Sequence, residues 1–168
     1  MVAMSTSANP LDDPADAAAL AAHARALLAA VEAALPAWVE RAVRQRWAEA
    51  GGGEVPAEVA ADARRAGDRA RGDLVPVLEA LLTTDVEAQR TNPLAIIRRA
   101  TAYATKVLHE ARVPPLERDA ESVRLFPDDL YDLTPASFGD LDPSVHEPGL
   151  VWGAAKAHVI LARRRRPT

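Results

Sequence analysis

The first half of the chain carries apolar residues at helical intervals. Between residues 20 and 47 they recur three, four or seven positions apart, which places them on one helical face: Leu20, Leu27, Leu28, Val31, Leu35, Val39, Val43 and Trp47. Asp13 has the position of an N-cap and Pro14 that of the first helical residue. Pro36 predicts a kink or two helices that meet near Leu35, and glycines 51–53 predict the end of the helix.

A second helix is predicted to begin at Pro56. It has a basic face diluted by Asp62, Asp68 and Asp73, so we expect this face to be solvated and salt-bridged; its arginines are Arg64, Arg65, Arg69 and Arg71. Pro76 predicts a break or a kink. The residues on both sides of it form the most apolar patch of the first half: Leu74, Val75, Val77, Leu78, Leu81 and Leu82.

The clearest helical pattern spans Pro93–Arg112, with Thr91 or Asn92 as its cap. One face is apolar, and the opposite face carries Arg98, Thr101, Thr105, His109 and Arg112. The two prolines at 114 and 115 predict its end, and a short helix to about Leu125 is expected to follow.

Residues 127–147 change in character. They hold six acidic residues, no basic residue and three prolines, which exclude a long helix, yet large apolar residues alternate with the acids. One interpretation is a segment that wraps over the helical core with its acids in water. The other is an acidic, hydrophobic ligand for a basic groove on a partner, with contacts from Asp128, Asp129, Tyr131, Asp132, Phe138, Asp140 and Asp142.

A last helix is predicted from about Pro148. Between Leu150 and Ala162 it is apolar in nearly every direction, which is typical of a helix at the centre of a bundle or against a partner. A basic tail follows at once: Arg163, Arg164, Arg165 and Arg166. These arginines could be a solvated chain end, pair with the acidic segment, or bind an anion such as a phosphate or a lipid headgroup.

The composition narrows the class of protein. Alanine occupies 37 of 168 positions and isoleucine only three, which favours helices over strands. The chain has no cysteine, so disulfides, thiol nucleophiles and cysteine-ligated metals are excluded. A net charge of −4 argues against a protein-wide nucleic-acid surface. Without a signal-like start or a membrane-length apolar run, we expect a cytoplasmic protein.

Enzymatic motifs are scarce. The sequence has no nucleophile elbow, phosphate-binding loop, metal-ligand histidine pair or calcium loop, so no catalytic residue, metal or cofactor is predicted. His158 lies on an apolar side of the last predicted helix and is the best candidate for an acid or base. A small-molecule pocket would place His158 and Tyr103 together.

Three segments of the C-terminal half resemble sequences of a family of uncharacterised helical proteins from actinobacteria: TNPLAIIRRATAYATKVL, FPDDLYDLTPASF and HEPGLVWGAAKAHVILARR. The resemblance implies a helical fold and agrees with the excess of arginine, 18 against two lysines. It implies no activity, cofactor or catalytic residue.

Together these patterns predict an all-α domain, an irregular bundle of five or six helices over residues 12–162, between a disordered tail at 1–11 and a basic tail at 163–168. The expected core is Leu27, Val31, Leu35, Trp38 or Trp47, Leu78, Leu82, Ile97, Tyr103, Val107 and Trp152. The leading hypothesis is a non-enzymatic adaptor or regulator that binds a protein through residues 126–147. The alternatives are a nucleic-acid-associated protein that uses its arginines and a pocket protein or enzyme near His158. A homo-oligomer stays open.

Overall fold

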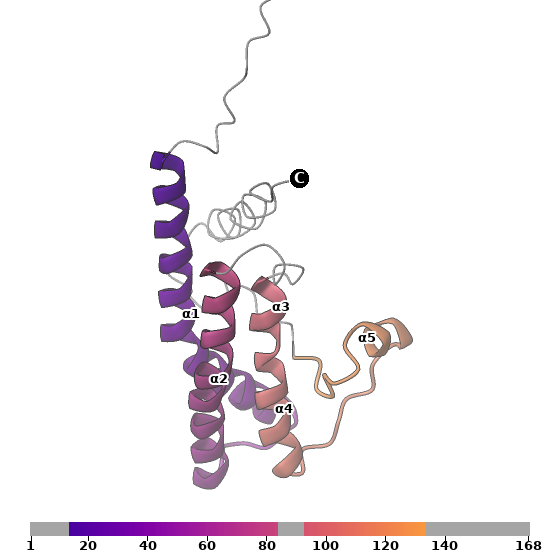
Figure 1. The fold of residues 1–168 in the computed structure, drawn as a ribbon. Helices are drawn as coiled ribbons and strands as arrows, with labels where there is room; N and C mark the ends of the chain where they lie inside the picture. Colours follow the sequence, from indigo (N-terminus) through magenta and orange to yellow (C-terminus); the bar gives the residue numbers. More distant parts are fainter. Residues whose placement is uncertain (1–13, 84–92, 134–168) are drawn as a thin grey trace, which may run out of the picture.

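The protein is all-α over the residues that the computed structural model describes, 14–83 and 93–133. No strand occurs among these residues. The helices are α1 (Pro14–Glu49), α2 (Ala57–Thr83), α3 (Pro93–Arg98), α4 (Ala100–Glu110) and α5 (Ala120–Leu125). Successive legs α1, α2 and α3–α4 alternate in direction, and α1, α2 and α4 all pack on one another (Figure 1). The expected tails at 1–11 and 163–168 lie outside the described residues.

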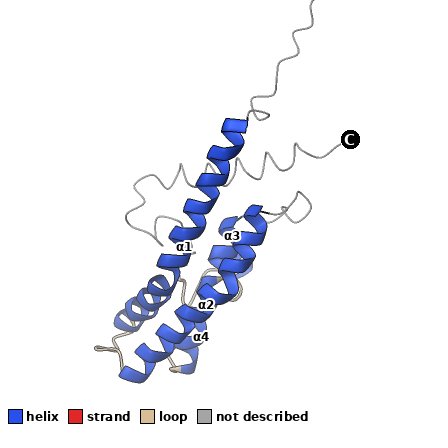
Figure 2. Cartoon of the chain, turned by 60° about the vertical axis from the view of Figure 1, so that its left-hand side comes forward, coloured by secondary structure: helices blue, strands red, loops and turns tan. Residues whose placement is uncertain are grey.

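Helix α1 is bent near its predicted breaking point. It is continuous from Pro14 to Glu49, but its two parts run in different directions (Figure 2). Pro36 lacks the N–H that would bond the carbonyl of Glu32, which is the ordinary cause of a helix bend. The backbone of α2 approaches the bend at Gly67, where an added Cβ would lie 2.7 Å from the Pro36 carbonyl oxygen. Gly67 is therefore a contact point between two helix backbones.

Pro76 does not break α2. The helix continues to Thr83 although the proline ring removes one hydrogen bond, the one that Gly72 would accept. Both residues are exposed, so water can reach this part of the backbone. The apolar patch around Pro76 is buried except for Val77, which is 42% exposed.

The helix predicted over residues 93–112 is divided at Arg99. Two short-range bonds tighten the backbone there, from Arg99 N to the Ile96 carbonyl (3.1 Å) and from Ala102 N to the Arg99 carbonyl (3.1 Å). The Thr101 hydroxyl also donates to the Arg98 carbonyl over 2.8 Å. This tighter turn separates α3 from α4 without sending the chain elsewhere, because α4 continues below α3 (Figure 1).

Helices α1 and α4 end in the same C-terminal motif. After α1, Gly52 N bonds the Trp47 carbonyl over 3.1 Å and Gly51, with φ of 78°, takes the left-handed position of a Schellman motif. The Trp47 indole N–H donates to the Gly52 carbonyl over 2.9 Å. After α4 the same pattern recurs, but Arg112 takes the left-handed position with φ of 60°.

The core contains most of the predicted residues. Those that are buried are Leu27, Val31, Leu35, Trp38, Leu78, Leu82, Ile97 and Val107. Trp47 and Tyr103 pack partly buried at its edge, and Trp152 lies outside the described residues. Alanines also belong to the core: Ala63, Ala66 and Ala70 on α2, which the prediction missed, and Ala100 and Ala104 on the predicted apolar face of α4. Thr105, expected on the wet face of its helix, is buried, whereas His109 is exposed as expected.

Candidate functional site

An arm leaves the bundle after α4 and returns to it at Tyr131. We call residues 114–130 the α5 arm; α5 at its outer part stands away from the other helices (Figure 1). Two hydrogen bonds join its ends: Leu116 N donates to the Leu130 carbonyl over 3.0 Å, and the Tyr131 hydroxyl donates to the Val113 carbonyl over 2.8 Å. The arm is thus an excursion of the chain whose two ends are joined by hydrogen bonds at its base.

Contacts within the arm hold its shape. Asp119 caps α5, accepting from Ser122 N and from the Ser122 hydroxyl over 2.8 Å each. These hydrogen bonds, the backbone one first, hold the pKa of the Asp119 carboxyl below its usual value. The Arg118 guanidinium donates to the Phe126 carbonyl over 2.7 Å and ties the two flanks of α5 together.

The arm exposes large apolar side chains. Leu125 is 53% exposed and Val123 45%, and Leu116 and Phe126 are each 38% exposed. In the part of the chain that the structure describes, Val77 on α2 is the other large apolar residue with this degree of exposure. No residue of α5 is buried, so this short helix contributes nothing to the core. The exposed apolar group is therefore a feature of the arm.

Two of the residues predicted to contact a partner belong to the fold instead. Tyr131 has no exposed surface and Asp129 is 7% exposed, while the neighbouring Leu133 also joins the core. Tyr131 cannot offer its ring to a partner because that ring fills the core at the base of the arm. Asp128 and Asp132 are exposed and keep their predicted accessibility. The other predicted contacts, Phe138, Asp140 and Asp142, lie outside the described residues.

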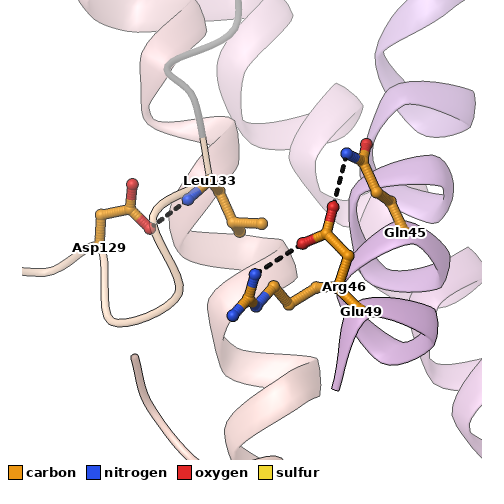
Figure 3. A network of polar contacts seen from close by, with 5 residues as sticks. All are labelled: Gln45, Arg46, Glu49, Asp129 and Leu133. Carbon is orange, nitrogen blue, oxygen red and sulfur yellow. Dashed lines mark hydrogen bonds and ion pairs between the residues drawn. The ribbon is translucent and has the colours of Figure 1, made fainter. Parts of the chain in front are cut away.

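Asp129 closes the turn at the base of the arm. Its carboxylate accepts from Leu133 N over 2.9 Å (Figure 3). Burial raises the pKa of this carboxyl above its ordinary value of 3.8, opposed by the backbone N–H groups of Leu133 and Tyr131 and by the charge of Arg118. The cost of burying the charge accordingly outweighs the hydrogen bonds that it receives.

The last turn of α1 appears in the same view. Glu49 accepts from Gln45 Nε2 over 2.9 Å and from Arg46 Nη1 over 2.6 Å, and these bonds lower the pKa of its carboxyl, Gln45 contributing most (Figure 3). The Nε atom of Arg46 is buried and has no hydrogen-bond partner. These contacts fix the end of α1 and supply no chemistry of their own.

Two of the four arginines on the basic face of α2 are paired with acidic residues of the same helix, in line with the predicted salt-bridged face. Arg65 pairs with Asp62, and Arg71 lies 3.4 Å from Asp68. Asp73, the third diluting acid, accepts from the Tyr103 hydroxyl. Acidic partners thus interrupt the arginine cluster that the nucleic-acid hypothesis requires. The second part of that hypothesis, Arg163 to Arg166, lies outside the described residues.

Tyr103 lies between α2 and α4. Its hydroxyl donates to Asp73 Oδ2 over 2.7 Å. Desolvation and this hydrogen bond raise the pKa of Tyr103 to about 12, so the phenol stays protonated at neutral pH. His158, its predicted pocket partner, lies outside the described residues. The Tyr103 hydroxyl therefore has a structural role in joining two helices.

Within the described ranges, no group of three or more His, Asp or Glu side chains could hold a metal ion, and no helix is long and apolar enough to cross a membrane. No family profile, curated protein or solved structure matches the chain. The resemblance to actinobacterial helical proteins stays a prediction.

The exposed residues of α5 escaped the sequence reasoning, which began the candidate segment at Phe126. The sequence did contain a signal for an element outside the long helices, because Val123 and Leu125 lie in a short segment between the double proline at 114–115 and Pro127.

Proposed function

We propose that this chain is a non-enzymatic helical interaction protein, an adaptor or regulator, that binds a cytoplasmic protein partner. Its contact surface would be the α5 arm together with the acidic segment that continues from Phe126 to residue 147. The observation that carries the proposal is the exposure of Leu116, Val123, Leu125 and Phe126 on an arm whose helix buries none of its residues. Large apolar side chains that are exposed on a surface favour contact with another surface that excludes water.

The charge of the arm indicates the chemistry of the partner. Residues 114–130 contain five acidic residues, of which Asp129 is buried, and two basic residues, a net charge of −3. A surface that is both apolar and acidic fits an apolar groove with a basic rim. Electrostatic attraction of this kind speeds association and weakens with salt.

The closed base supports a binding role for the arm. Tyr131 is anchored in the core, and the bond between Leu116 and Leu130 joins the two ends. A surface that is already held in place loses less conformational freedom when it binds. The bundle would then act as the scaffold and the arm as the contact element.

The test is capture of a partner from nuclease-treated cytosol with the tagged full chain and two matched variants. Val123→Asn changes a residue that is 45% exposed on the arm, and Val77→Asn changes one that is 42% exposed on α2. We expect Val123→Asn to reduce recovery of the partner about tenfold or more and Val77→Asn to leave it unchanged. A Tyr131→Ala variant is unsuitable because it would empty part of the core.

Other outcomes contradict the proposal. Equal recovery by the wild type and by Val123→Asn, with both chains folded by circular dichroism, would remove the arm from the interface. Recovery that requires intact nucleic acid would favour the nucleic-acid hypothesis instead.

A further inference from the structure

We propose that residues 150–166 of this same chain cover the α5 arm in the free protein, so that a partner must displace them. The inference concerns the regulation of the proposed binding surface and therefore rests on the proposed function. It follows from the apolar character of the arm, from its charge and from the place where the described chain ends.

The two surfaces match in composition. The arm exposes Leu116, Val123, Leu125 and Phe126. Residues 150–162 contain one charged residue, Lys156, among apolar ones, and as a helix they would extend over about 20 Å. That length exceeds the six residues of α5, so the segment is long enough to span this short helix.

The charges are opposite. The α5 arm, residues 114–130, has a net charge of −3, whereas residues 150–166 carry five basic residues and no acidic one. Asp128 and Asp132 are exposed on the returning side of the arm, where basic side chains can approach them. The last four residues of the segment, Arg163 to Arg166, would be the cationic counterpart of this acidic side.

The described chain ends next to the arm. Leu133 packs in the core at the base of the arm, and its N–H bonds Asp129. Only residues 134–149 separate it from the apolar segment, and these 16 residues reach at most about 55 Å when extended. A segment tethered at this distance has a high effective concentration at the arm, so even a weak contact is populated.

The experiment uses the absence of cysteine from the chain. Two double variants of the full-length protein are treated with a short bismaleimide: Val123→Cys with Ala155→Cys, and the matched control Val77→Cys with Ala155→Cys. We expect intramolecular cross-linking to be about tenfold faster for the Val123 pair than for the Val77 pair. High salt and the change of all four tail arginines to serine should both slow the reaction of the Val123 pair.

Three results would overturn the inference. Equal rates for the two pairs would mean that the segment does not prefer the arm, and faster reaction of the Val77 pair would place it on α2. A dimeric product whose share grows with protein concentration would make a second copy the occupant.

Partner capture separates this inference from the proposed function. If cross-linking fails but Val123→Asn still loses the partner, the proposed function stands and the inference falls. If cross-linking succeeds but Val123→Asn captures the partner normally, the proposed function falls together with the displacement by a partner, and the contact between the segment and the arm stands. If both hold, the variant with four serines should capture more partner than the wild type, because its arm is more often uncovered.

Discussion

The buried hydroxyl of Thr105 lowers the stability of the fold that surrounds it. The residue is 8% exposed on α4, and its Oγ1 atom is buried with no hydrogen-bond partner. A polar group taken out of water without a partner lowers the free energy of unfolding. The helical pattern placed Thr105 on the wet face, and this prediction was wrong because helices pack on both sides of α4.

We expect Thr105→Val to raise the free energy of unfolding by about 1 kcal/mol, since it removes the unpaired hydroxyl and keeps the shape of the side chain. Thr101→Val is the matched control on the same helix. The Thr101 hydroxyl donates to the Arg98 carbonyl, so its loss should lower stability by about 0.5–1.5 kcal/mol. Urea unfolding of both variants measures the difference. The same sign for both would refute the assignment.

Asp129 makes the free energy of unfolding fall as the pH rises, which is the opposite of the usual effect of a carboxylate. Because its pKa is raised from 3.8, the folded chain binds a proton more tightly than the unfolded chain. That contribution is present below pH 3.8 and is lost as the pH rises through the folded value. Asn keeps an oxygen for the Leu133 N–H and has no charge to bury. Asp129→Asn should therefore gain stability relative to the wild type as the pH rises from about 4 to 7, as measured by denaturant midpoints. Parallel pH profiles would contradict this account.

Between elements, the decisive contact is the one between α1 and α2 at Pro36 and Gly67. Sequence reasoning predicted the bend at Pro36 but gave Gly67 no part in it. No pattern within α2 could reveal that the backbone of another helix lies against Gly67. The same limitation explains Pro76, whose predicted break is absent because α2 packs along its length against α1, α3 and α4.

Two glycine variants separate packing from helix propensity. Gly67→Ala would place a Cβ 2.7 Å from the Pro36 carbonyl oxygen, so we expect it to lower the free energy of unfolding by about 1–3 kcal/mol. Gly72, on the same helix, has nothing within 4 Å of an added Cβ, and Gly72→Ala should raise stability by about 0.5–1 kcal/mol. Thermal and urea unfolding compare the two. A gain at Gly67 would show that the helices do not approach closely there.

For the molecule as a whole, the helical content and the core followed from periodicity, whereas the arm did not. Apolar spacing identifies α1, α2 and α4 because each has a face long enough to repeat its pattern. The acidic segment offered two interpretations, and its described part divides between them. Phe126 is exposed, while Tyr131 and Leu133 enter the core. Only tertiary contacts decide which apolar residue of an irregular segment is buried.

The two tyrosines report on the folded state together. Tyr103 joins α2 to α4 and its pKa is raised to about 12, and burial also raises the pKa of Tyr131 at the base of the arm. Stability from a raised tyrosine pKa is present below pH 10 and is lost as the pH rises toward about 12. In an alkaline titration, tyrosinate absorbance should therefore rise together with the loss of helical circular dichroism. In denaturant, the same groups should titrate near pH 10. Ionisation of both tyrosines in a chain that stays folded would contradict this coupling.

The closed base of the arm has a consequence for how such a protein can change. Hydrogen bonds join Leu116 to Leu130 and Tyr131 to Val113, so the bundle contacts the same two chain segments whatever residues lie between them. The intervening residues can be exchanged, lengthened or grafted onto another scaffold at little cost to the core, since closing a longer loop adds little entropy. The residues of the core and those of the arm thus lie in separate stretches of the sequence, and selection can change one stretch while it conserves the other.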